Sequence, residues 1–132
     1  MFELESKKYN IFISHTGRKE EEYSRFEEKL ISAHDFEFYN YSTPKDDRTT
    51  YESLEKQINP VGVVIILSGL YNKYKNIIQR QIDIAVKMNK PIIIIRPFGM
   101  ENVPPELEKI AEDVVGWNAP CIVDAIEENY QE

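Results

Sequence analysis

Four stretches of the chain are rich in β-branched and aromatic residues and are bounded by turn-forming residues: 9–14, 36–41, 61–67 and 91–96. This pattern predicts β-strands. The third and fourth stretches, VGVVIIL and PIIIIR, are continuous apolar runs. Such runs are typical of parallel strands that are covered by helices on both faces. A short fifth strand is predicted at residues 114–117.

The segments between these strands carry apolar residues at helical spacing. The clearest segment covers residues 20–33, where Tyr23, Phe26, Leu30 and Ala33 fall on one stripe and charged residues on the other. Further helices are predicted over residues 50–58, 71–88 and 104–112. A last helix follows Asn118, whose side chain can cap it, and reaches about residue 129.

Strands and helices therefore alternate along the chain, which predicts an α/β, flavodoxin-like three-layer sandwich. Right-handed crossovers favour a central parallel five-stranded sheet of order 2-1-3-4-5. The length of 132 residues fits one domain, residues 1–132. In this architecture ligands bind beyond the carboxyl ends of the strands, a rim made here of residues 14–18, 41–50, 68–74 and 97–102.

The charge balance narrows the choice of partners. Acidic residues outnumber basic ones by 23 to 16, for a net charge of −7, which disfavours nucleic acid as a partner. The single cysteine, Cys121, excludes an internal disulfide and is expected to be a buried, inert thiol. No apolar run approaches the roughly 20 residues of a membrane span, and no signal core is visible. We therefore expect a cytoplasmic protein with no membrane contact.

The end of the first predicted strand carries the segment Ser14-His15-Thr16-Gly17. Small polar side chains and a glycine before a helix can hold an anion such as phosphate. On the alternative interpretation, Ser14 or Thr16 only caps the following helix and His15 is a surface ring.

Two further rim segments carry polar or aromatic residues. In the loop over residues 41–50, Asp46 and Asp47 suggest a divalent metal, although adjacent aspartates in a loop are more often solvated, and no metal is assigned. Tyr71 and Tyr74 could stack on a flat ring or serve only as packing groups. A phospho-receiver is excluded because Ser68, and not an aspartate, ends the third strand.

Several blocks in order, YNIFISHTG, VGVVIILSGLYNKYKNIIQRQIDIA, KPIIIIRP and VVGWNAPCIVDAI, resemble the bacterial TIR-like domains of the ThsB type from Thoeris antiphage defence. The likeness covers nearly the whole chain. It implies a hydrolase that cleaves the nicotinamide–ribose bond of NAD, or a cyclase, which makes an ADP-ribose-derived second messenger for a separate effector. It also implies a phage-derived trigger and self-association, with NAD as substrate and no cofactor.

The resemblance also assigns site residues. Such domains carry a glutamate in a helical pattern like W-I-x-x-E-I-x-x-A; here Ile77 takes the aromatic position, Ala85 the alanine and Gln81 the place of the glutamate. A carboxylate would stabilise the oxocarbenium-like transition state, whereas an amide keeps the shape and loses the charge. We therefore expect binding to survive better than turnover.

The remaining site residues that the resemblance implies are all substrate-binding: Phe12, Ser14, His15, Tyr41, Asp46, Arg48, Tyr71 and Tyr74. The amide at position 81 is either a natural divergence or an introduced change from acid to amide. Two other functions stay open. One is a non-catalytic TIR-type interaction module, for which a missing glutamate is no loss; the other is a flavodoxin-like carrier of FMN or another nucleotide.

Overall fold

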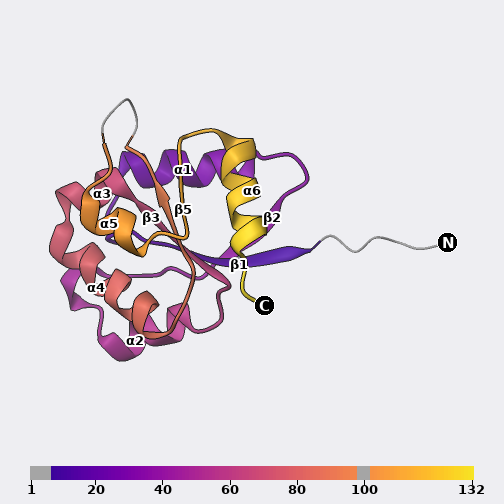
Figure 1. Ribbon diagram of the computed structural model, residues 1–132. Helices are drawn as coiled ribbons and strands as arrows, with labels where there is room; N and C mark the ends of the chain where they lie inside the picture. Colours follow the sequence, from indigo (N-terminus) through magenta and orange to yellow (C-terminus); the bar gives the residue numbers. More distant parts are fainter. Residues whose placement is uncertain (1–6, 98–101) are drawn as a thin grey trace.

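The computed structural model describes residues 7–97 and 102–132, which form a three-layer α/β sandwich (Figure 1). Its five parallel strands lie in the order β2-β1-β3-β4-β5, which confirms the predicted fold class and strand order. The strands are β1 (Lys8–Ile13), β2 (Glu37–Asn40), β3 (Val63–Leu67), β4 (Ile92–Ile95) and β5 (Asp113–Val115).

Helices cover both faces of the sheet. On one face lie α1 (Glu21–Ile31) and α6 (Ala119–Asn129); on the other lie α2 (Tyr51–Ile58), α4 (Lys75–Lys87) and α5 (Pro105–Ile110). The short helix α3 (Ser68–Lys73) follows β3 directly and contributes residues to both layers. A 3₁₀ turn, η1 (Asp46–Arg48), lies in the loop between β2 and α2.

Two hydrophobic cores hold the layers together, because successive side chains of a strand point to opposite faces. In β1, Ile11 and Ile13 join the core beneath α1 and α6, while Phe12 joins the core beneath α2, α4 and α5. The strands β3 and β4 divide in the same way. Burial on both faces explains why their sequences are apolar without interruption.

The helix predicted at residues 71–88 is two helices in the structure. Tyr74 lies between α3 and α4 with φ −130° and ψ 50°, outside the helical region. Its ring packs against both hydrophobic cores. The break at Tyr74 therefore turns the chain around the rim of the sheet, which a uniform helical periodicity does not reveal.

The expectation of a buried cysteine is wrong. Cys121 is exposed, although the helix that contains it was placed correctly. It lies in the first turn of α6, where its backbone N–H donates to the capping side chain of Asn118 over 3.0 Å. The buried positions of this helix are Ile122, Ala125 and Ile126, so Cys121 faces away from the core.

Residues after α6 cross the amino ends of the central strands. The hydroxyl of Tyr130 accepts a hydrogen bond from the backbone N–H of Asn10 at 3.0 Å. The N–H of Gln131 donates to the carbonyl of Gly62 at 2.9 Å. The Tyr130 ring also meets the Tyr9 ring edge-on, with centroids 4.9 Å apart. These contacts fasten the end of the sheet opposite the predicted rim.

Candidate functional site

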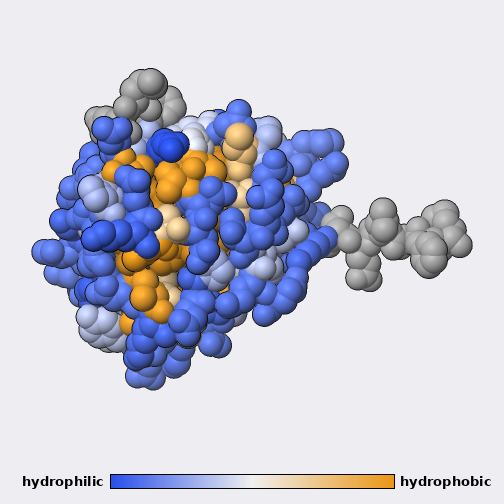
Figure 2. Space-filling view, viewed as in Figure 1, coloured by the Kyte–Doolittle hydropathy of each residue, from blue (hydrophilic) through white to orange (hydrophobic). Residues whose placement is uncertain are grey.

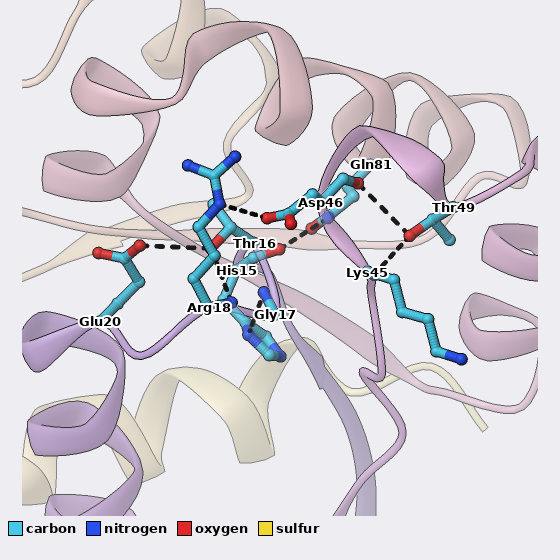
Figure 3. Close-up of polar contacts among 9 residues, drawn as sticks. All are labelled: His15, Thr16, Gly17, Arg18, Glu20, Lys45, Asp46, Thr49 and Gln81. Carbon is cyan, nitrogen blue, oxygen red and sulfur yellow. Dashed lines mark hydrogen bonds and ion pairs between the residues drawn. The ribbon is translucent and has the colours of Figure 1, made fainter.

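Gln81 lies on α4 and reaches the carboxyl end of β1 (Figure 3). Its Oε1 accepts a hydrogen bond from the hydroxyl of Ser14, and its Nε2 donates to the carbonyl oxygen of His15 at 2.8 Å. Gln81 is 1% exposed and Ser14 is fully buried. The structure therefore brings together two segments 66 and 67 residues apart, at the rim where α/β folds bind ligands.

His15 is a neutral, fixed side chain and not the surface ring of the alternative interpretation. Its Nδ1 accepts from the N–H of Gly17, and its Nε2 lies 3.1 Å from the Ser42 hydroxyl, which itself donates to Asn40. Its ring stacks on that of Tyr23, with centroids 3.7 Å apart. Burial lowers the pKa of His15 to about 4. At neutral pH, His15 therefore orders the loop after β1 and carries no charge.

The loop between β2 and α2, residues 41–50, closes over this end of β1. The N–H of Asp46 donates to the carbonyl of Thr16 at 2.7 Å. The carboxylate of Asp46 pairs with Arg18 Nε at 2.5 Å (Figure 3). Thr16 is fully buried. The β2–α2 loop is therefore bound to the segment that directly follows β1.

A second arginine holds the same loop from the other side. Arg80 donates to the carbonyl oxygens of Asp47 at 3.1 Å and Thr49 at 2.8 Å. Its guanidinium lies 4.8 Å from the centre of the Tyr51 ring. Because Arg80 precedes Gln81 on α4, the position of the loop is coupled directly to the helix that carries the candidate catalytic position.

Gly17 allows the segment after β1 to lie close to the β2–α2 loop. Its φ is +90°, and a β-carbon there would lie 2.1 Å from the carbonyl oxygen of Pro44. We predict that Gly17→Ala destabilises the fold by about 1–3 kcal/mol, from backbone strain and displacement of the β2–α2 loop. Urea unfolding measures the change. Gly116→Ala is a suitable control, because no atom lies within 4 Å of a β-carbon there. An equal effect of both substitutions would contradict the prediction.

For four of the sequence-predicted binding residues, the observed contacts are with residues other than Ser14, His15 and Gln81. Phe12 is fully buried in a hydrophobic core, and Tyr71 is 2% exposed with its hydroxyl 3.1 Å from the Gln79 side-chain oxygen and 3.4 Å from the Glu106 carboxylate. Tyr41 packs against Tyr39, with ring centroids 4.6 Å apart. Arg48 is exposed on η1. A direct ligand contact by Phe12 or Tyr71 would require their surroundings to rearrange.

Tyr74 and Asp46 are connected to the cluster through Arg18. The Arg18 guanidinium lies 5.5 Å from the centre of the Tyr74 ring while its Nε contacts Asp46. Proximity to Asp46 raises the pKa of Arg18, which therefore remains charged. Arg18 thus contacts both Tyr74 at the α3–α4 junction and Asp46 in the β2–α2 loop.

Sequence reasoning missed Arg18 and Arg80 as site residues. Both belong to runs of mixed charge that resemble any solvated helix face or loop. Only the position of Arg80 next to Gln81 was a usable signal, since neighbours on a helix lie about 100° apart and both can face one rim. The sequence placed Arg18 and Asp46 on the same predicted rim, but it did not indicate that these two side chains, 28 residues apart, form an ion pair.

A comparison with known families bears on this site. Residues 12–102 match the family described as Thoeris protein ThsB, TIR-like domain. The chain belongs to this family. The match to the ThsB family includes the end of β1, the β2–α2 loop and Gln81, and it confirms the resemblance seen in the sequence. The chain is therefore a TIR-type domain of Thoeris antiphage defence. A comparison with curated proteins finds no match.

Within the residues that the structure describes, no group of three or more His, Cys, Asp or Glu side chains could hold a metal ion. Asp46, one of the two adjacent aspartates for which a divalent metal was considered, pairs with Arg18.

Proposed function

We propose that this domain binds NAD with its nicotinamide ribose beside Gln81 and cleaves the bond between nicotinamide and ribose. The observation that carries the proposal is the contact of Gln81 with Ser14 and with the His15 carbonyl at the carboxyl end of β1. Family membership supports it, because the ThsB resemblance assigns the catalytic glutamate to this position.

The chemistry explains why the residue at position 81 decides the rate. As the C1′–N bond breaks, its electron pair moves to the nicotinamide nitrogen, and the ribose becomes an oxocarbenium ion. Water then adds to give ADP-ribose and releases a proton, or a nucleophile within the molecule closes a ring. Gln81 can hydrogen-bond the ribose hydroxyls as acceptor and donor, but it lacks the negative charge that stabilises the cation. We infer that the chain binds NAD and turns it over slowly.

The existing hydrogen bonds of Ser14 and Gln81 support a ribose site at this place. Ser14 and Gln81 now satisfy one another, which meets the requirement that buried polar groups be paired. A ribose diol offers the same donors and acceptors and can replace these contacts without leaving a group unpaired. Entry requires the β2–α2 loop to move, so binding and loop opening are coupled.

Substitutions at Ser14 and Tyr74 test the proposed binding site. We predict that Ser14→Ala weakens NAD binding about 2- to 10-fold, the loss of one hydrogen bond, with the domain still folded. Tyr74→Ala weakens it similarly, while Tyr74→Phe, which keeps the ring over Arg18, does not. Isothermal titration calorimetry measures the affinity, and Ser24→Ala, at an exposed position of α1, is the control. Unchanged affinity in both alanine variants would place the ligand elsewhere.

The proposal includes the partners that the resemblance implies. The product would activate a separate effector, and a phage-derived trigger would open the closed site. In the described part of the chain, no helix is long and apolar enough to span a membrane. We propose that NAD cleavage takes place in the cytoplasm, where NAD is available, with NAD as substrate and no cofactor.

A non-catalytic interaction module is the second candidate, favoured by an apolar groove between α4 and α5. Figure 2 shows apolar surface gathered on the face that carries α5. Ile82, Val86, Leu107 and Ile110 line the groove together with charged residues, and Val86 is 49% exposed. Sedimentation equilibrium of the unsubstituted chain and of Val86→Lys discriminates the functions. Self-association lost in the variant, combined with no NAD binding, would favour the module.

A further inference from the structure

Near the candidate site, Arg18 contacts residues from two different parts of the fold. Arg18 follows β1, pairs with Asp46 of the β2–α2 loop and lies over the ring of Tyr74 at the α3–α4 junction. Its side chain is 51% exposed and that of Asp46 is 23% exposed. The pair is therefore accessible from solvent, whereas Ser14 and Gln81 are buried.

An exposed ion pair of this kind contributes little to stability, so a competing anion can break it. A diphosphate is a strong competitor, because it carries more charge than a carboxylate and can accept two parallel hydrogen bonds from a guanidinium. The surrounding protein has a net charge of −7 and repels anions in general. An anionic ligand is therefore expected to depend on a local cation at the mouth.

Arg80, the other arginine of the rim, is a poorer candidate for this role. Both of its terminal nitrogens donate to loop carbonyls, of Asp47 and Thr49, and its guanidinium lies over Tyr51. Capture of a ligand by Arg80 would leave those carbonyls without a donor. Arg18 exchanges one anion for another and leaves only a solvent-accessible carboxylate, so its exchange costs less.

We propose that Arg18 exchanges Asp46 for the diphosphate of the ligand, and that this exchange removes one of the contacts that hold the β2–α2 loop against the segment after β1. The proposal rests on the proposed function for the identity of the ligand, a dinucleotide diphosphate. Arg18 is thus a specificity-determining residue, which favours NAD over its dephosphorylated fragment and links ligand capture to the loss of one contact of the β2–α2 loop. Tyr74 keeps the guanidinium in place while its anion changes.

Three probes separate this proposal from the proposed function: NAD, nicotinamide riboside, which lacks the diphosphate, and inorganic pyrophosphate. Binding is measured by calorimetry on the unsubstituted chain, Arg18→Gln, Arg18→Lys and Asp46→Asn. Lys19→Gln is the matched control, because it removes the same charge from the neighbouring exposed position. Thermal melting of each variant verifies that it is folded.

We expect Arg18→Gln to weaken binding of NAD and of pyrophosphate about 10- to 100-fold, as for loss of charge-assisted hydrogen bonds, and to leave nicotinamide riboside unaffected. Arg18→Lys should recover part of the loss. Asp46→Asn removes the competing carboxylate and should tighten NAD binding about 2- to 5-fold. Lys19→Gln should match the unsubstituted chain.

Equal NAD affinity in Arg18→Gln and Lys19→Gln would overturn the role of Arg18 while leaving the proposed function intact. An equal loss for NAD and nicotinamide riboside would also overturn it, because Arg18 would then act on the site as a whole. Pyrophosphate binding that depends on Arg18, without binding of NAD or nicotinamide riboside, would support anion capture and refute the proposed function. Absence of binding by all three probes would overturn both.

Discussion

The Gln81→Glu variant is expected to release nicotinamide from NAD about 10²–10³ times faster than the unsubstituted chain. The substituted side chain reaches the same place beside Ser14 and supplies the negative charge that the oxocarbenium-like transition state requires. Affinity for NAD should change much less than turnover, because the amide already offers hydrogen bonds to the ribose hydroxyls.

The same substitution carries a cost in the closed structure. Gln81 Nε2 donates to the His15 carbonyl at 2.8 Å, and a carboxylate oxygen in its place would face that carbonyl without a proton to share. We expect the free energy of unfolding to fall by about 1–3 kcal/mol. Higher turnover together with lower stability would indicate that the carboxylate is unfavourable in the closed structure and acts on the substrate only after the loop has opened.

Chromatographic assay of nicotinamide release measures the rate, and chemical unfolding measures the stability. Gln79→Glu is the matched control: it makes the same change of charge on the same helix, at a position that contacts Tyr71 and Asp83 and not Ser14. Folded Gln81→Glu protein without added turnover would remove the basis for the enzymatic function. A comparable gain in Gln79→Glu would show that position 81 is not special.

Acidification from pH 6.5 to pH 4 is expected to cost the fold roughly 3 kcal/mol through His15 alone. Burial lowers the pKa of His15 in the folded chain to about 4 from an ordinary value of 6.5. Between these values the unfolded chain binds a proton that the folded chain does not, so the contribution is fully present above pH 6.5. It is lost as the pH falls toward 4, and it changes no further below that.

Urea unfolding at a series of pH values between 7.5 and 4 measures this contribution. Carboxylates also titrate near the lower end, so the informative quantity is the difference between the unsubstituted chain and His15→Asn, which should have a lower stability with a flatter dependence on pH. His34→Asn is the control, since the His34 side chain is 95% exposed. Parallel pH profiles for the unsubstituted chain and His15→Asn would refute the assignment.

Much of the fold could be read from the sequence because its signals are local. Uninterrupted runs such as VVIIL and IIII are buried on both faces and occur as β3 and β4. The order of the sheet then follows from the handedness of crossovers. The break at Tyr74 and the outward position of Cys121 were not predicted, because each depends on how one helix meets the rest of the molecule.

The candidate site was predicted less completely than the fold. The meeting of Ser14, His15 and Gln81 was expected from a resemblance to a family, and the structure places the three together. The closure of the site was not foreseen. It depends on Arg18, Arg80 and Gly17, whose contacts with the β2–α2 loop arise only when β1, β2 and α4 are side by side.

The contacts of Tyr130 and Gln131 suggest that thermal stability and ligand recognition can be changed independently in this domain. These contacts hold the end of the sheet that is remote from Gln81. There the Tyr130 hydroxyl accepts a hydrogen bond from the Asn10 N–H, and the Gln131 N–H donates to the Gly62 carbonyl. Improved packing around Tyr9, at that end of the sheet, would compensate for the loss of folding stability caused by substitutions near Gln81. A variant stabilised in this way could tolerate a charged residue at position 81, which would otherwise lower the free energy of unfolding.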